Sequence, residues 1–127
     1  LFFQFVVRGT VDKLIGDAIT VIYGDPIPQI DHAERAINSA IQIQEIVKSF
    51  QSKWLKEYNT ELEVGIGINT DEAILGTIGS EEFYDYTALG RGVNLASRLE
   101  SGCPGGEIHV SKNTYDLLKE IYQFEFI

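Results

Sequence analysis

The stretch LEVGIGIN at residues 62–69 alternates branched apolar residues with glycine. Alternation with a period of two is typical of a β-strand, and Val and Ile favour strands. A glycine inside a strand usually marks a bulge or a place where another backbone approaches closely. We therefore expect a strand in which Gly65 and Gly67 have one of these roles. It is not a dinucleotide-binding loop, because the third glycine of that motif is missing.

The flanking segments predict further strands and helices in a regular order. Residues 72–79 are expected to pair with residues 62–69, and residues 10–15 and 18–23 to form two strands joined by a tight turn at Gly16-Asp17. This order predicts an α/β sandwich whose mainly antiparallel sheet is flanked by helices. The other expected elements are the end of a helix over residues 2–7 with Gly9 just past it, helices at 33–56, 92–101 and 111–120, and strands at 107–110 and 121–127.

The longest predicted helix, residues 33–56, carries signals at its start and along one face. Asp31 followed by Glu34 matches a capping box. Ser111 is expected to cap the N-terminus of the last helix. Apolar residues recur at helical spacing along the long helix and should pack on the sheet. These residues are Ala36, Ala40, Ile43, Val47, Phe50 and Trp54.

Composition limits the classes of function that are open. The 127 residues suffice for one domain with a hydrophobic core. Nineteen acidic and ten basic residues give a net charge of −9, which opposes non-specific binding to nucleic acid or anionic lipid. An anionic substrate would therefore need metal ions and a few well-placed cations. The single cysteine, Cys103, cannot form an internal disulfide and suits a reducing cytoplasm.

Two groups of polar residues suggest chemistry. Asn94 and Arg98 are four residues apart on one face of a predicted helix, where an amide and a guanidinium suit a phosphate or a developing negative charge. Asp17, four residues after Lys13, could bind Mg²⁺, which prefers one or two carboxylates together with water and phosphate oxygens. Taken alone, each group is better explained by an ordinary feature: a solvated helix face for Asn94 and Arg98, and a Gly-Asp turn for Asp17.

Four stretches together resemble the catalytic domain of the class III adenylate and guanylate cyclases. They are GTVDKLIGDAITVIYGDP (9–26), HAERAINSAIQIQ (32–44), VGIGINTDEAILGTIGSEEFYDYTALGRGVNLASRLES (64–101) and PGGEIHVSKNTYDLL (104–118). The resemblance covers about residues 9–118 and implies the ferredoxin-like fold of that family, with residues 1–127 as a single, N-terminally truncated catalytic domain.

The resemblance also implies a reaction and a role for each matching residue. The adenylate cyclases form 3′,5′-cyclic AMP and pyrophosphate from ATP with two Mg²⁺ or Mn²⁺ ions per site. Asp17 corresponds to one of two metal-binding aspartates. Lys13 and Thr87 correspond to the pair that contacts the base, in the pattern that selects adenine. Asn94 corresponds to the residue that orients the ribose, and Arg98 to the one that stabilises transition-state charge on the phosphates.

In this family a head-to-tail homodimer divides each active site between two chains. Asp17 of one chain would then act with the other four residues of its partner. The segment at residues 80–86, SEEFYDY, lies where family members extend an arm that helps to dimerise. We expect a cytoplasmic domain with no nucleic-acid partner. An upstream regulatory or sensor domain is expected in the parent protein, which could tether the domain to a membrane.

The chain departs from the family pattern at several positions. The first metal-binding aspartate and a phosphate-binding lysine near the C-terminal end of the domain have no counterpart, so we expect a fragment with impaired activity by itself. Asp71 replaces a common glycine, and Arg91 replaces a common Asp or Asn just before the catalytic helix. A catalytically silent homology domain that dimerises or binds nucleotide is therefore an alternative, and a guanylate cyclase is another.

Overall fold

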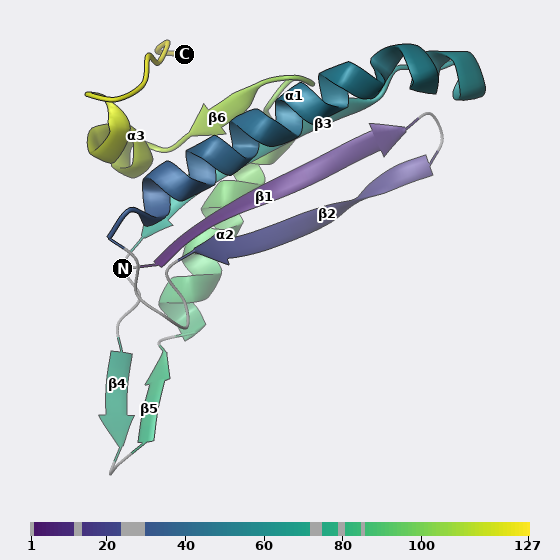
Figure 1. The fold of residues 1–127 in the computed structure, drawn as a ribbon. Coiled ribbons are helices and arrows are strands. Elements are labelled where there is room, and N and C mark those ends of the chain that lie inside the picture. The colour runs from purple at the N-terminus through teal and green to yellow at the C-terminus, as the bar shows by residue number, and fades with distance from the viewer. Residues whose placement is uncertain (1, 12–13, 24–29, 72–74, 79–80, 85) are drawn as a thin grey trace.

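The computed structural model describes residues 2–11, 14–23, 30–71, 75–78, 81–84 and 86–127, with side chains at residues 21, 23, 30–71 and 90–127. Strands and helices alternate irregularly along the chain (Figure 1). In order they are β1 (Phe2–Val11), β2 (Leu14–Tyr23), α1 (His32–Tyr58), β3 (Glu63–Asp71), β4 (Leu75–Ile78), β5 (Glu81–Tyr84), α2 (Tyr86–Ser101), β6 (Ile108–Val110) and α3 (Lys112–Leu118). No helix in the described part of the chain combines the length and hydrophobicity of a membrane span.

Four strands form the central sheet in the order β2-β1-β3-β6. β1 pairs antiparallel with both β2 and β3, whereas β6 runs parallel to β3. β4 and β5 pair with each other in a separate hairpin that projects away from the sheet (Figure 1). The predicted α/β architecture with a mainly antiparallel sheet is confirmed.

The two faces of β3 carry different residues and receive different helices. Ile66 and Ile68 are fully buried and belong to the same apolar cluster as Ala36 of α1. Successive residues of a strand point to opposite faces, so Gly65 and Gly67 face the other way, towards α2 and the residues just after it. The sheet therefore lies between α1 and α2 (Figure 1).

The backbone of α2 lies directly on the glycine face of β3. A Cβ atom at Gly67 would be 2.4 Å from the carbonyl oxygen of Ala96 and 2.5 Å from the amide nitrogen of Glu100. A Cβ atom at Gly65 would be 2.8 Å from the carbonyl oxygen of Cys103. These distances leave no room for a side chain, so of the two predicted roles, bulge or close approach, close approach is the one that both glycines have.

Asn69 forms a second link between β3 and α2. Its side chain is buried, with 1% of its surface exposed, and its Nδ2 donates a hydrogen bond to the carbonyl oxygen of Gly92 at 3.2 Å. Its Oδ1 has no hydrogen-bond partner within the described residues. Because a buried amide needs its partners, this bond fixes the position of α2 along β3.

The predicted turn at Gly16-Asp17 is wrong. These two residues lie inside β2, which is continuous from Leu14 to Tyr23, at a point where its pairing with β1 changes register. Two residue steps on β1 face three on β2 there, which is the pattern of a β-bulge. The paired residues on either side are Arg8 with Ala18 and Thr10 with Ile15.

The N-terminal segment also differs from the prediction. Residues 2–7, expected to end a helix, belong to strand β1, and Gly9 lies within it. The run FFQFVV has aromatic and β-branched residues that suit a strand. A short apolar run fits either a helix face or a strand, so its periodicity alone did not separate the two.

One other predicted strand pairing and one predicted strand are wrong. β4 pairs with β5 and not with β3. Residues 121–127 form no strand, although Tyr122 and Phe124 pack against the apolar core and the Tyr122 hydroxyl hydrogen-bonds Asn38 Oδ1. In both cases the error concerns which segments lie side by side in the fold. The alternation of apolar residues within one segment does not indicate its pairing partner.

The helix ends follow the prediction in part. Ser111 caps α3 as predicted, because its hydroxyl accepts a hydrogen bond from the Thr114 amide at 3.4 Å. Asp31 makes no capping bond, so the predicted capping box is wrong; its carboxylate accepts from Arg35 Nε at 2.9 Å instead.

Phe50, which was expected to pack on the sheet, is 49% exposed. α2 begins at Tyr86, six residues before its predicted start.

Gly67→Ala should lower the free energy of unfolding by about 3 kcal/mol, because the added methyl group overlaps two backbone atoms that cannot rotate away. Gly90→Ala is the matched control in α2, since a Cβ atom there meets nothing within 4 Å. Alanine favours a helix over glycine by about 1 kcal/mol, so this control should be neutral or stabilising. Denaturant unfolding followed by circular dichroism measures both. Equal stability of the two variants would contradict the contact.

Asn69→Asp should destabilise the protein more at pH 7.5 than at pH 5, because it removes the donor to Gly92 and buries a carboxylate. Burial raises the pKa of that carboxyl above its unfolded value, so the native state gains a proton, and stability, as the pH falls. Asn113→Asp is the matched control: Asn113 also donates through Nδ2, to Thr70 O at 3.2 Å, but is exposed. Unfolding at both pH values tests this. An equal, pH-independent loss in the two variants would show that burial at residue 69 has no such effect.

Candidate active site on helix α2

Helix α2 turns one face to the sheet and the other to solvent. Gly92, Ala96 and Glu100 follow one another at intervals of four residues and are buried on the side of β3. Asn94 and Arg98 share the opposite face, as their spacing predicts. The exposed residues of this face are Arg91, Asn94, Leu95 and Arg98, which we call the exposed stripe of α2.

The polar groups of Asn94 and Arg98 make no hydrogen bond or ion pair with the residues that the structure describes. Arg98 therefore keeps its five N–H donors for a ligand. A guanidinium can donate two parallel hydrogen bonds to a phosphate. The Asn94 amide, one turn earlier, offers both donors and an acceptor. The exposed stripe can therefore bind an anion that also carries hydroxyl groups.

Gly67 and Asn69 determine where this face lies, although neither belongs to it. Gly67 lets the α2 backbone settle on β3, and Asn69 holds Gly92, two residues before Asn94. Asn69 was not among the predicted site residues. The signal that could have identified it is a polar residue directly after the branched apolar positions of a strand, because such a residue must find a partner when it is buried.

The other predicted site residues are described only in part. The backbone of Asp17 lies in β2, within the bulge, and that of Thr87 lies in the first turn of α2. Their side chains, and all of Lys13, lie outside the described residues. The structure therefore places Asn94 and Arg98 on one helix face and leaves their arrangement with the other three residues open.

Thiol and imidazole groups elsewhere show the features of structural residues. The Cys103 thiol donates to the carbonyl oxygen of Glu107 at 3.2 Å, and burial raises its pKa, which lowers its thiolate character. His32 is buried at the start of α1, and burial lowers its pKa. Within the described ranges, no three His, Cys, Asp or Glu side chains come together as a metal site.

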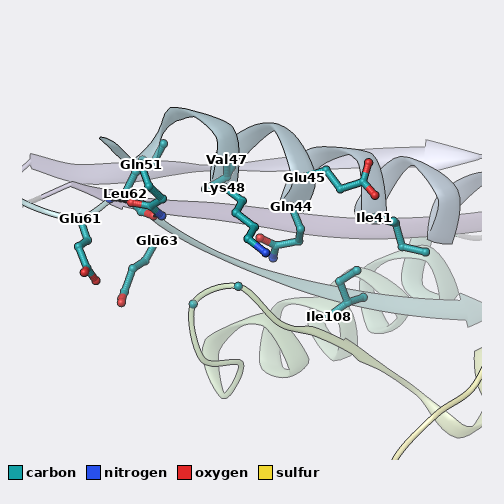
Figure 2. Close-up of a pocket in the computed structure, with 12 residues that line it drawn as sticks. Ile41, Gln44, Glu45, Val47, Lys48, Gln51, Glu61, Leu62, Glu63 and Ile108 are labelled. Carbon is teal, nitrogen blue, oxygen red and sulfur yellow. Dashed lines mark hydrogen bonds between the residues drawn. The ribbon is translucent and has the colours of Figure 1, made fainter. Parts of the chain in front are cut away.

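A cavity of about 470 Å³ opens on the α1 side of the molecule, between α1, the start of β3 and the turn at Gly105-Gly106 (Figure 2). The side-chain amide of Gln44, at its wall, already donates through Nε2 to the carbonyl oxygens of Val64 and Glu107. The Gln51 amide is likewise paired with the backbone of Leu62. Gln44 thus links α1 to β3 and to the end of the turn, Gln51 links α1 to the start of β3, and no residue of α2 lines the cavity.

Comparison with known proteins agrees with this geometry. The chain matches the family model of the adenylate and guanylate cyclase catalytic domain over residues 9–127. Adenylate cyclase 1 of Rhizobium meliloti is 35% identical over 92 residues, which are 72% of this chain and 14% of that protein. The membrane guanylyl cyclase of Dictyostelium discoideum is 36% identical over 112 residues, which are 87% of this chain and 7% of that protein.

The fold has solved counterparts in the same family. The crystal structure of the adenylyl cyclase CyaB from P. aeruginosa superposes with a TM-score of 0.70 at 28% identity, covering 94% of this chain and 81% of that chain. The chain spans only 14% and 7% of the lengths of the two curated relatives. The family match, the shared fold and the exposed stripe of α2 agree: the chain belongs to the class III adenylate and guanylate cyclase family, as a catalytic domain.

Proposed function

We propose that this domain forms 3′,5′-cyclic AMP and pyrophosphate from ATP. The observation that carries the proposal is that α2 presents Asn94 and Arg98 together on a solvent-facing stripe while its opposite face is held on β3. Such a stripe provides fixed donors for a nucleoside triphosphate in a chain whose net charge of −9 would otherwise repel it. The proposed substrate, dimer and residue roles rest on the resemblance of these residues to the family motifs.

In the proposed reaction, the ribose 3′-oxygen loses its proton and bonds to the α-phosphorus, and the bond from that phosphorus to the departing pyrophosphate breaks. Arg98 would donate to the phosphate oxygens as negative charge develops on them. Asn94 would hydrogen-bond the ribose and hold it in line. A donor aimed at developing charge is worth about 3 kcal/mol or more of barrier reduction.

The choice between ATP and GTP depends on residues that contact the base. Relatives of both kinds are similar to this chain at 35% and 36% identity, so overall similarity does not decide it. Lys13 would donate to N1 of adenine, and the Thr87 hydroxyl would accept from its 6-amino group. Guanine has an N1–H donor and a 6-oxo acceptor at these two positions, and the Lys13 ammonium has no acceptor for that N1–H. We therefore favour ATP over GTP.

Mg²⁺ or Mn²⁺ would complete the site. Asp17 supplies one carboxylate, and Mg²⁺ commonly combines one or two carboxylates with water and substrate phosphate oxygens, so this donor suits one such ion. Among the described residues, no group of three or more His, Cys, Asp or Glu side chains could hold a metal ion without Asp17 and the substrate. When bound, the metal ions supply charge neutralisation on the phosphates and lower the pKa of the attacking hydroxyl.

The proposed assembly is a head-to-tail homodimer. Asp17 of one chain would then share a site with Lys13, Thr87, Asn94 and Arg98 of the other. The domain would act in the cytoplasm, under an upstream regulatory or sensor domain of the parent protein. Formation of cyclic AMP by the intact protein supplied with ATP and Mg²⁺ or Mn²⁺ tests the proposal. A protein that binds nucleotide and dimerises without forming product would instead be the catalytically silent alternative.

Arg98→Ala should reduce the kcat for cyclic AMP formation at least about 100-fold with a smaller change in KM, because the lost donor acts mainly on charge in the transition state. Arg35→Ala is the matched control, since Arg35 is an exposed arginine on α1 that pairs with Asp31 at 2.9 Å. It should change kcat less than about twofold. Steady-state rates with ATP measure both variants. An unchanged kcat in Arg98→Ala would contradict the assigned role.

Lys13→Glu should lower the ratio of kcat/KM for ATP to that for GTP by about tenfold or more, because a carboxylate accepts from guanine N1–H and opposes adenine N1. Lys112→Glu makes the same charge change at an exposed residue of α3 and should leave the ratio unchanged. Competing turnover of ATP and GTP, separated by chromatography, gives the ratio directly. A preference for ATP that survives in Lys13→Glu would count against base recognition by this residue.

A further inference from the structure

Arg91 lies between the residues of α2 that the proposed function assigns to the base and to the ribose. The rise of an α-helix places it about 6 Å along the axis from Thr87 and about 4.5 Å from Asn94. At about 100° per residue, each of these two residues lies within about 60° of it around the axis. A purine with its 6-amino group at Thr87 and its ribose at Asn94 would therefore lie beside Arg91.

Leu95 continues the surface that Arg91 begins. It comes one helical turn after Arg91 and is 42% exposed, so an apolar side chain faces solvent on the exposed stripe. Such a side chain gains nothing from a phosphate, but contact with the apolar face of an aromatic ring removes its surface from water. Gly90, directly before Arg91, has no side chain, and a Cβ atom there would meet nothing within 4 Å. The stripe thus has room for a flat ring at this level of the helix.

The Arg91 guanidinium is exposed and forms no ion pair with the described residues. The only acidic residue between Tyr86 and Ser101 is Glu100, which is buried on the side of the sheet. No carboxylate of α2 therefore competes with a ligand for this group. A guanidinium is planar and weakly hydrated, and it stacks on aromatic faces.

The backbone beside Arg91 is held in place before any ligand binds. Its neighbour Gly92 is buried, and the Gly92 carbonyl oxygen accepts the hydrogen bond from Asn69 Nδ2 at 3.2 Å. A side chain on an anchored turn of helix loses less freedom on binding than one on a loop. Arg91 is thus supported by the same contact that positions Asn94.

We propose that Arg91 is a further substrate-binding residue, whose guanidinium stacks on the face of the adenine ring. In the proposed site Lys13 and Thr87 contact the edge of the base and Asn94 contacts the ribose, so these three residues leave the ring face uncovered. Every purine has such a face, so Arg91 would add affinity for the nucleoside without selecting ATP over GTP. The inference rests on the proposed function and gives a role to a residue at which the chain departs from the family pattern.

The test compares Arg91→Ala with Arg91→Tyr in the intact protein, with Lys119→Ala as a control for the loss of one exposed cation at the end of α3. Tyrosine keeps a flat surface for stacking but carries no charge. Adenosine, which has the base and ribose without phosphates, is the main probe, as an inhibitor and as a ligand in calorimetry. Pyrophosphate, which has no base, is the negative probe. Gel filtration with light scattering reports the oligomeric state of each variant.

Arg91→Ala should weaken adenosine binding about fivefold and raise the KM for ATP by a similar factor, with kcat changed less than about twofold. Arg91→Tyr should bind adenosine within about twofold of the unmodified protein, because the stack is restored. Pyrophosphate affinity and the ratio of kcat/KM for ATP to that for GTP should be the same in all variants. Lys119→Ala should match the unmodified protein throughout. A structural role for Arg91 would instead weaken adenosine and pyrophosphate together.

Three results would overturn the inference. The first is unchanged adenosine affinity in Arg91→Ala. The second is a loss in Arg91→Tyr as large as that in Arg91→Ala, which would show that the charge matters and the stack does not. The third is loss of the dimer in Arg91→Ala, which would assign Arg91 to a contact with a partner chain.

Direct binding of adenosine separates this inference from the proposed function. If the unmodified protein binds adenosine but makes no cyclic AMP, and Arg91→Ala weakens that binding, the stacking contact holds and the cyclase activity fails. If the unmodified protein makes cyclic AMP and Arg91→Ala binds adenosine equally well, the activity holds and the stacking contact fails.

Discussion

The backbone contact between β3 and α2 at Gly67 positions the rest of the candidate site. A Cβ atom there would lie 2.4 Å from the Ala96 carbonyl oxygen, so the two elements can meet at this separation only because residue 67 has no side chain. Asn69 then fixes α2 along β3 through its hydrogen bond to Gly92. With one face of α2 held in this way, its opposite face must be the one that reaches solvent.

The helix on one side of the sheet contributes the apolar core, and the helix on the other side carries the candidate site residues. On one side, Ile66 and Ile68 bury against the small residues of α1, and this apolar layer supplies the hydrophobic stabilisation. On the other side, α2 needs little apolar area because its backbone lies so close to the strand. Its exposed stripe is therefore free to carry Asn94 and Arg98, cationic and amide groups that would be costly to bury.

The local parts of the fold could be predicted from the sequence better than their pairing. The strand at β3, the Ser111 cap and the shared face of Asn94 and Arg98 follow from neighbouring residues and helical or strand periodicity. The bulge at Gly16-Asp17 was mistaken for a turn, because the same residue types favour both. The partner of β4 was also mistaken, since pairing depends on residues far apart in the chain.

The sequence by itself determined the family, the residue types of the candidate site and the spacing that puts Asn94 and Arg98 on one helix face. Those features depend only on covalent order and on the 3.6-residue period of the helix. Only the tertiary structure decided which face of α2 is exposed, that Asn69 anchors it, and that Arg91 lies on the exposed stripe without a competing carboxylate from α2. These features arise from the contact between β3 and α2, which joins residues that are about 30 positions apart in the chain.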